Sequence, residues 1–240
     1  MTDILFEYNH ILMRAEYKSP DIHKHLASHL VLGLNGELSC VVQDKIFQCS
    51  GVFIASDVEH TIYAESGDML VFLFDPTSDM ANDIDAQYLK GKDYALIDAT
   101  MVQKLRDIWD AHGSNLKTAD EALLAECQIA SGSITIADNR IQKVISCLGE
   151  RDTIPENIIE SLCRTVCLSE SRLSHLFKEQ VGIALNRYIV LDKMKKTYLH
   201  YTRSGNITEA ALAAGFYSSS HFAATCKKMF GLSFSEIMKS

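Results

Sequence analysis

The N-terminal part of the chain alternates short hydrophobic runs with residues that favour turns. Between His29 and Asp75 the runs are rich in Val, Ile, Leu and Phe. Turn signals separate them at close intervals: Asn35-Gly36, Asp44-Lys45, Ser50-Gly51, Asp57 and Ser66-Gly67-Asp68. Short apolar runs divided in this way are typical of β-strands in a sandwich or a small barrel. The pattern therefore predicts a β-rich N-terminal part.

After Pro76 the period of the hydrophobic positions becomes helical. One series falls at i, i+4, i+7 and i+8, and its members are Met101, Leu105, Ile108 and Trp109. This spacing places them on one face of a helix over 98–112. We expect a second helix over 118–130, followed by a short linker at Ser131-Gly132-Ser133.

The C-terminal part is helical in period from Asp138 onward and contains one unit twice. A shift of 49 positions aligns the two copies without a gap. The identical pairs are Asn157 with Asn206, Ile158 with Ile207, Glu160 with Glu209, Ser169 with Ser218, Ser171 with Ser220, Lys178 with Lys227 and Gly182 with Gly231. A repeat of this kind indicates a duplicated supersecondary unit.

Each copy is expected to be a helix, a tight turn and a second helix that begins at a serine. The first helices fall at about 156–166 and 207–214, and serine is a good N-cap for the second ones. Gly182 is a C-terminal stop for the second helix of copy one. The inward positions are apolar: Leu173, Leu176, Phe177, Phe222 and Met229. The outward positions are small or polar: Ser171, Arg172, Ser174, His175, Lys178, Ser219, Ser220, Ala223, Ala224 and Lys227. Such units are helix-turn-helix motifs.

A single long helix is expected between the two units, over about 184–203. Its apolar residues recur every three or four positions, at Tyr188, Leu191, Met194, Tyr198 and Tyr201. At 1.5 Å per residue such a helix spans on the order of 30 Å. Successive major-groove faces of B-DNA lie about 34 Å apart, so this connector suits two helices that enter one face of a duplex.

Two segments in this part, LSESRLSHLFKEQVG and NITEAALAAGFYSSSHFAATCKKMFG, resemble the AraC/XylS-type DNA-binding domain of bacterial transcription regulators. The resemblance covers residues 138–240. It implies base-reading positions at Ser171, Arg172, Ser174 and His175, where the last is commonly Arg. The equivalent position of copy two is Ala224, so copy two is expected to hold phosphates through Lys227, Lys228 and helix N-termini. The segment 1–97 resembles the cupin-like sensing domain often joined to this domain, and 98–130 the helical pair that commonly dimerises.

Four histidines match positions of the cupin motifs. His23, His25 and His29 occupy odd positions of HKHLASH, so on a single β-strand they would share one face. His29 stands where metal-binding cupins usually have Glu, and His60 corresponds to the histidine of the second motif. Neutral imidazoles suit Zn, Ni, Cu or Fe, whereas a site without carboxylates disfavours Mg or Ca. Two alternatives to a metal site are a pocket for an organic effector and a pocket that senses nothing.

Cysteine usage indicates a reducing compartment. The seven cysteines include no CxxC pair and do not form an evident disulfide framework. Cys40 and Cys49 would be opposed across two strands if Asp44-Lys45 were the hairpin turn, but not if the turn came one residue earlier. We expect these cysteines to be buried as small apolar residues. The N-terminus lacks the pattern of a signal peptide, and no apolar run has the length of a membrane span.

Charge divides the chain at the same place as the hydrophobic pattern. Residues 1–137 contain 9 Lys and Arg against 21 Asp and Glu, a net charge of −12. Residues 138–240 contain 14 against 10, a net charge of +4. The overall charge of −8 thus conceals a mildly basic C-terminal part. That part remains compatible with binding to DNA.

Together these patterns predict an α+β chain with a cupin-like β-barrel followed by an all-α domain with two helix-turn-helix units. The expected divisions are 1–97 for sensing, 98–133 for the helical pair and linker, and 134–240 for DNA binding. The expected function is a cytoplasmic, sequence-specific transcription regulator controlled by a metal ion or a small effector. Expected partners are double-stranded DNA, that effector, a second copy of the chain and RNA polymerase, but no membrane. The alternative is a dioxygenase-like cupin metalloenzyme, which the lack of a motif-placed acid, base or nucleophile disfavours.

Overall fold

The computed structural model of the chain describes residues 4–15, 22–64, 67–129, 136–230 and 234. By its internal contacts the chain divides into two compact units. The first holds Met1–Ser131 and Cys226–Ser240, and the second holds Gly132–Thr225. Each unit is described by itself. The predicted linker at 131–133 and Gly231, the repeat partner of Gly182, lie outside the described residues.

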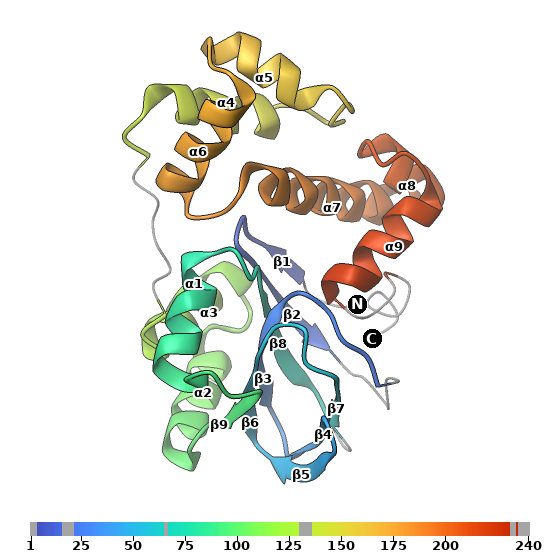
Figure 1. Cartoon of the computed structure of the whole chain (residues 1–240). Helices are drawn as coiled ribbons and strands as arrows, with labels where there is room; N and C mark the ends of the chain where they lie inside the picture. Colours follow the sequence, from blue (N-terminus) through green and yellow to red (C-terminus); the bar gives the residue numbers. More distant parts are fainter. Residues whose placement is uncertain (1–3, 16–21, 65–66, 130–135, 231–233, 235–240) are drawn as a thin grey trace. The chain divides into compact units, whose positions relative to one another are not determined.

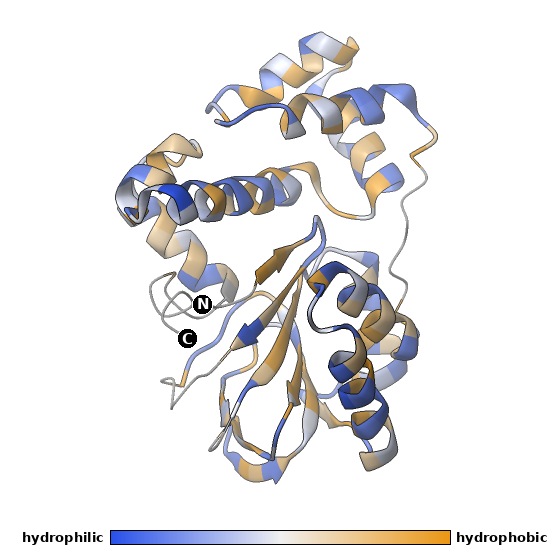
Figure 2. Cartoon of the chain, turned by 180° about the vertical axis from the view of Figure 1, so that it is seen from behind, coloured by the Kyte–Doolittle hydropathy of each residue, from blue (hydrophilic) through white to orange (hydrophobic). Residues whose placement is uncertain are grey.

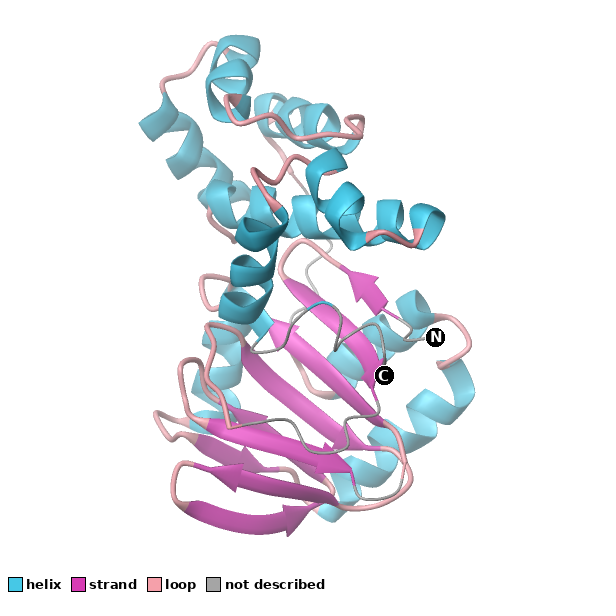
Figure 3. Cartoon of the chain, turned by 90° about the vertical axis from the view of Figure 1, so that its right-hand side faces the viewer, coloured by secondary structure: helices cyan, strands magenta, loops and turns pink. Residues whose placement is uncertain are grey.

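The first unit is built mainly of antiparallel strands. Their bounds are β1 (Ile4–Phe6), β2 (His10–Ala15), β3 (Ser28–Gly33), β4 (Leu38–Val42), β5 (Lys45–Cys49), β6 (Gly51–Ile54), β7 (His60–Ala64), β8 (Met69–Phe74) and β9 (Tyr94–Leu96). One sheet has the order β1-β2-β8-β3-β6-β9, and a smaller one has the order β5-β4-β7. The β-rich, cupin-like prediction is thus confirmed, although the described strands form two sheets rather than one closed barrel (Figure 3).

Helices of the first unit cover one face of the larger sheet (Figure 1). They are α1 (Asp79–Ile84), the π-helix η1 (Asp85–Leu89), α2 (Ala99–His112) and α3 (Leu116–Glu126). Every second residue of the strands points into the core between the sheet and these helices, including Leu12, Leu30, Phe53 and Phe72. Burial of such side chains stabilises each by about 1.5–3 kcal/mol. The strands of this sheet are predominantly hydrophobic in Figure 2, since both of their faces are covered.

The alternate positions of the same strands point away from the helices. In the register, His29 on β3 faces Leu73 on β8, which in turn faces Ile11 on β2. His29 therefore lies on the opposite face from its neighbour Leu30, because successive side chains of a strand alternate. The larger sheet thus separates the helix-covered core from the face that carries His29.

The two predicted helices after Pro76 are present, and both pack on the sheet of their own chain. Asp98 caps α2 by accepting a hydrogen bond from the amide of Met101 at 3.0 Å. Val102 and Leu105 are buried in the core, with Met101, Ile108 and Trp109 packed against it. The helix predicted over 118–130 runs instead from Leu116 to Glu126. The apolar face of α2 is thus used within the chain, and a homodimer, which stays a prediction, would need another surface.

The second unit and the end of the chain are helical, as predicted. The helices are α4 (Asn139–Gly149), α5 (Ile158–Val166), α6 (Glu170–Val181), α7 (Leu185–Ser204), α8 (Ile207–Ala213) and α9 (Ser219–Phe230). α7 has 20 residues and is therefore about 30 Å long, which agrees with the predicted connector. No helix in the described part of the chain combines the length and the apolar character needed to cross a membrane.

Candidate nucleic-acid interface and histidine cluster

The first helix-turn-helix consists of α5 and α6, and its predicted caps are both observed. The Ser169 hydroxyl accepts a hydrogen bond from the amide of Arg172 at 3.3 Å, which fixes where α6 begins. Gly182 ends α6 with φ +79°, in the left-handed region that glycine adopts without strain. Phe177 is fully buried and contacts Tyr188 of α7, with ring centroids 5.2 Å apart. The caps and this contact hold α6 on the start of α7.

The outward face of α6 is free to meet a ligand. Leu173, Leu176 and Phe177 point into the core, as predicted. The outward residues are exposed, except for Ser174, which is half-buried: Ser171, Arg172, Ser174, His175 and Lys178. The polar ridge expected to read bases is thus on the surface of this unit.

The second helix-turn-helix consists of α8 and α9. Its turn contains Gly215 with φ +96° and Phe216, whose ring lies 5.0 Å from that of Phe222. The Ser218 hydroxyl accepts a hydrogen bond from the amide of His221 at 3.0 Å, which confirms the predicted serine cap. Phe222 and Met229 are buried, also as predicted. The outward residues are half-buried at Ser219 and exposed at the others: Ser220, Ala223, Ala224, Lys227 and Lys228.

A short segment before α5 contacts the end of α8 and thereby joins the two motifs. The Thr153 hydroxyl donates to the carbonyl of Ala213 at 2.7 Å, and the Ile154 amide donates to the carbonyl of Ala214 at 3.2 Å. Gly215 lies so close to Ile154 that a Cβ would come within 2.9 Å of its carbonyl carbon. We call this contact the interlock.

Lys193 of α7 supports the same turn from the other side. Its ammonium group donates to the carbonyl of Gly215 at 2.8 Å and lies 5.8 Å from the centre of the Phe216 ring. Sequence reasoning missed Thr153, Ile154 and Lys193, because the partners lie 60, 60 and 22 residues away. The clearest signal was Gly215 itself, a glycine at a predicted tight turn.

The four predicted histidines meet in the first unit. The ring centroids of His25 and His29 are 4.4 Å apart, those of His29 and His60 are 4.7 Å apart, and those of His23 and His60 are 4.8 Å apart. The candidate ligand nitrogens of His23, His25 and His60 lie within 4.8 Å of one another. His25, His29 and His60 are buried, and His23 is half-buried. We call these four residues the histidine cluster.

The prediction that His23, His25 and His29 share one strand face is wrong. Only His29 lies in a strand, β3, whereas His23 forms an isolated bridge with His60. The backbone between them bonds to the loop before β7 instead of to a ladder. The carbonyl of His25 accepts from the Asp57 amide at 2.9 Å, and that of Leu26 accepts from the Ser56 hydroxyl at 2.5 Å. The imidazoles converge because this loop holds the segment.

Hydrogen bonding leaves ring nitrogens of the cluster available. His60 Nδ1 lies 2.8 Å from the carbonyl of Val58, and because a carbonyl can only accept, Nδ1 carries the proton. This tautomer leaves Nε2 of His60 with its lone pair. Both ring nitrogens of His25 and Nδ1 of His29 are buried and have no hydrogen-bond partner. Such unpaired buried polar atoms are costly, so the cluster is suited to a ligand that engages them.

The environment keeps these imidazoles neutral. Burial, together with His60 and His23, lowers the pKa of His25 to about 2. Burial also lowers the pKa of His60 to about 4 and holds the pKa of His29 well below its ordinary value. Neutral imidazole is the form that binds transition metals.

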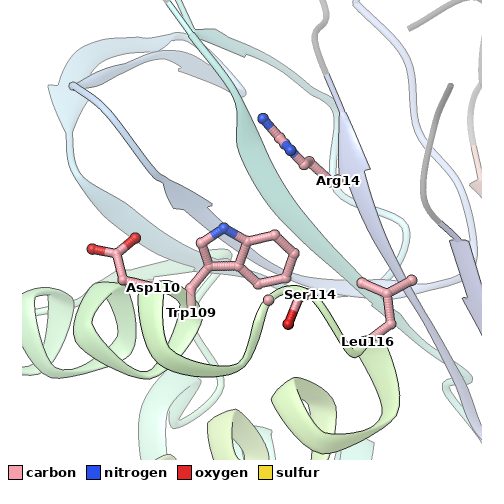
Figure 4. A pocket seen from close by; sticks show the side chains of 6 residues that line it. Arg14, Trp109, Asp110, Ser114 and Leu116 are labelled. Carbon is pink, nitrogen blue, oxygen red and sulfur yellow. The ribbon is translucent and has the colours of Figure 1, made fainter.

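A hollow elsewhere on the first unit offers less distinctive chemistry. It measures about 410 Å³ and lies between β2 and the turn from α2 to α3, where Arg14 and Trp109 line it (Figure 4). The guanidinium of Arg14 donates through Nε to the carboxylate of Asp68 at 2.6 Å. The cation of this hollow is thus already paired, and the other charged side chain that lines it is Asp110.

Comparison with known proteins supports the assignment of the helical part. The family described as "Helix-turn-helix domain" matches residues 162–240. The chain is 24% identical over 234 residues to the probable transcriptional regulator LumQ of Photobacterium leiognathi, covering 90% of this chain and 91% of LumQ. The matched domain contains α6 and the whole second motif, the elements whose caps and exposed faces are described above.

Two solved structures align with most of the chain at low sequence identity. ToxT from Vibrio cholerae superposes with a TM-score of 0.48 at 15% identity, covering 96% of each chain. The AraC-like transcriptional activator CuxR superposes with a TM-score of 0.43 at 10% identity, covering 89% of this chain and 84% of CuxR. Residues 162–240 therefore form a helix-turn-helix domain, and the chain is similar along most of its length to a probable transcriptional regulator.

Proposed function

We propose that this regulator reads its operator mainly through α6 and that a transition metal in the histidine cluster controls it. The observation that carries the second part is the set of buried ring nitrogens on His25 and His29 that have no hydrogen-bond partner. The first part rests on the chemistry of the two exposed helix faces. A cytoplasmic location, a homodimer and contact with RNA polymerase remain predictions.

The α6 face has the donors and acceptors that base reading needs. Arg172 and His175 are exposed on it, with the hydroxyls of Ser171 and Ser174 between them. Arg can bond guanine in the major groove through two atoms, and hydroxyls can bond either kind of base edge. The α9 face has methyl groups at Ala223 and Ala224, while its charges, Lys227 and Lys228, are in the last turn. α9 is therefore better suited to backbone contact, which carries no sequence information.

Substitution of His175 and of Lys227 by alanine should have different effects on DNA binding. His175→Ala should weaken binding to the cognate site by about 1 kcal/mol, roughly fivefold, and leave random DNA almost unchanged. Lys227→Ala should weaken binding to both and reduce the slope of log affinity against log salt by about one unit. The measurement is a fluorescence anisotropy titration at several salt concentrations. Lys104→Ala, an exposed lysine of α2 in the other unit, is the matched control.

The assignment of base reading to α6 fails if His175→Ala affects cognate and random DNA equally. It also fails if Lys227→Ala alters only the cognate site, because that result would give base reading to α9. A salt-dependent shift of genomic fragments by the unmodified protein supplies the cognate site for these measurements.

The donor set of the histidine cluster favours Zn, Ni, Cu or Fe. The group that can gather around one ion, His23, His25 and His60, offers imidazole nitrogens only, and His29 lies beside it. Imidazole suits these metals, and the hydrogen bond from His60 Nδ1 to Val58 orients its ring in the way usual for metal ligands. When bound, the metal supplies a cross-link between β7 and the segment before β3.

Metal binding on one face of the larger sheet can affect the helices on the other face, because β3 has side chains on both. His29 of β3 faces the cluster, while Leu30 of the same strand lies in the core under the helices. A metal that favours one position of β3 would change how α2 and α3 pack on the sheet. The metal can shift such an equilibrium only by binding one state more tightly than the other.

Removal of one ligand should abolish stable metal binding. We expect His25→Ala and His60→Ala each to lower the affinity for Zn²⁺ by at least about a hundredfold. Losing a residue that only orients a metal ligand already lowers metal affinity by about 10–100-fold, and these residues would be ligands themselves. The measurement is equilibrium dialysis against Zn²⁺ with elemental analysis, where the unmodified protein should hold about one ion per chain. His112→Ala, an exposed histidine at the end of α2, should bind like the unmodified protein.

Unchanged metal content in both variants would contradict the metal site. A protein that binds Zn²⁺ through the cluster but whose affinity for cognate DNA does not respond to Zn²⁺ would contradict the control and leave the metal site intact. The two halves of this proposal are thereby tested separately.

A further inference from the structure

Cys40 and Cys49 lie on neighbouring strands of the smaller sheet. The hairpin turn comes one residue earlier than Asp44-Lys45, since Val42 pairs with Lys45. Cys40 therefore faces Phe47, and Cys49 faces Leu38. The two cysteines are diagonal neighbours on one face, and their sulfur atoms lie 3.7 Å apart. Sequence reasoning left this pairing open because one residue in the turn decides it.

One member of the pair can be reached from solvent and the other cannot. Cys40 is 1% exposed, whereas Cys49 is half-buried on β5, which is an edge strand of its sheet. Cys40 faces Ile62 of β7, two residues after His60. The pair is thus close to the histidine cluster in the fold but shares no residue with it.

The environment activates the accessible thiol. The hydrogen bond between the two thiols lowers the pKa of Cys49, and the backbone of Gly51 acts in the same direction, whereas burial and the charge of Glu37 oppose this shift. That same hydrogen bond raises the pKa of Cys40, with burial adding to the effect. The thiolate is the nucleophile in thiol chemistry, so Cys49 is suited to attack and Cys40 to resolve.

We propose that Cys40 and Cys49 form a reversible disulfide when the protein meets hydrogen peroxide. The Cys49 thiolate attacks one peroxide oxygen, the O–O bond breaks, and after protonation one water leaves, giving a sulfenic acid. The Cys40 thiol then attacks that sulfur, the S–O bond breaks, and the hydroxide leaves with the thiol proton as a second water. Two thiols lose two electrons in total, and one hydrogen peroxide becomes two waters.

The bond requires a further approach of the two sulfur atoms. A disulfide has a sulfur–sulfur distance of about 2.05 Å, so the present separation of 3.7 Å must shorten by about 1.7 Å, through the side chains and the edge strand β5. The bond would fasten β5 to β4, and β4 is in turn paired with β7, which begins at His60. The disulfide would therefore stiffen the smaller sheet, whose strand β7 carries His60 of the cluster. The bond itself does not depend on a metal in the cluster.

The sequence allows a direct test. Trypsin cleaves after Lys24, Lys45 and Lys90, which places Cys40 and Cys49 in the separate peptides 25–45 and 46–90 with no other cysteine. The full-length protein is treated with stepwise additions of hydrogen peroxide, unfolded in urea that contains iodoacetamide so that buried thiols are also blocked, and digested without reductant. We expect the two peptides to appear joined, at a mass lower by two hydrogen atoms than their sum, and to separate after dithiothreitol.

The controls use the chain's own cysteines. In the unmodified protein Cys40 and Cys49 should lose alkylation together, at peroxide concentrations that leave the exposed Cys167 alkylated. In Cys40→Ser the joined peptides should disappear, and Cys49 should be found as the sulfenic acid with dimedone. The proposal is overturned if Cys49 is oxidised while Cys40 stays alkylated. It is equally overturned if both stay alkylated when Cys167 is already oxidised.

Discussion

Lowering the pH from 7 to 5 is expected to destabilise the metal-free N-terminal unit by at least about 4 kcal/mol, about 2 kcal/mol from each of His25 and His60. The cause is the set of three buried histidines, His25, His29 and His60, whose pKa values the fold lowers. In the unfolded chain each returns to about 6.5 and takes up a proton below that pH. The unfolded state therefore binds more protons, so stability is complete above pH 6.5 and falls as the pH drops.

The size of the effect follows from the width of the pH window. For His25 the window runs from pH 6.5 down to about 2, and for His60 down to about 4. At pH 5 the pH lies about 1.5 units below the unfolded pKa of each histidine. This difference lowers the free energy of unfolding by about 2 kcal/mol per histidine. Since domains are stable by about 5–15 kcal/mol, the unit should be close to unfolding at pH 5.

The single tryptophan allows the unfolding of this unit to be followed separately by fluorescence. Trp109 of α2 packs against the core of the larger sheet, and the second unit contains no tryptophan. Urea unfolding followed by tryptophan fluorescence, in the presence of a chelator, should give the free energy of unfolding at each pH. In His25→Leu the loss between pH 7 and 5 should be smaller by about 2 kcal/mol. His112→Ala should behave as the unmodified protein does, and equal stability at both pH values would contradict the buried neutral cluster.

Gly215→Ala should destabilise the helical unit by more than about 3 kcal/mol. Two penalties combine at this position. The backbone has φ +96°, where a residue with a Cβ is strained by roughly 1–2 kcal/mol. The new Cβ would also come within 2.9 Å of the carbonyl carbon of Ile154 and closer still to its oxygen, so the interlock must open. Opening it removes the hydrogen bond from the Ile154 amide to Ala214.

Gly205→Ala is the matched control for this clash. Gly205 ends α7 with φ +66°, but a Cβ there would meet nothing within 4 Å. It should therefore show only the strain, roughly 1–2 kcal/mol. Urea unfolding followed by far-ultraviolet circular dichroism compares the two variants. Equal effects would mean that the interlock contributes nothing to stability.

Features that depend on neighbours in sequence could be predicted from the sequence. Ser169 and Gly182 cap α6 where the local pattern put them, and Leu173 and Phe177 are buried because helical spacing fixes one face. The repeat made the second motif equally clear. The bonded partner of each cap, Arg172 for Ser169 and Lys178 for Gly182, lies within the same helix.

Features that depend on distant partners could not be predicted in detail. His25 left the expected strand because its carbonyl accepts from Asp57, a residue 32 positions later. The start of α3 differs from the expected one for a local reason, since Asn115 caps the helix and accepts from the amides of Lys117 and Thr118. The convergence of the histidines was nonetheless foreseen, since the motif spacing constrains which side chains meet even when the backbone path differs.

The interlock limits how this DNA-binding domain can be divided or recombined. A fragment ending after α7 would leave the Ile154 amide and the Thr153 hydroxyl without their acceptors at the end of α8. Chimaeras with other helix-turn-helix proteins should therefore exchange 152–230 as one piece, so that the interlock and the whole second motif stay together. Otherwise the segment before α5 would come from one protein and the end of α8 from another, and the hydrogen bonds between them would be lost.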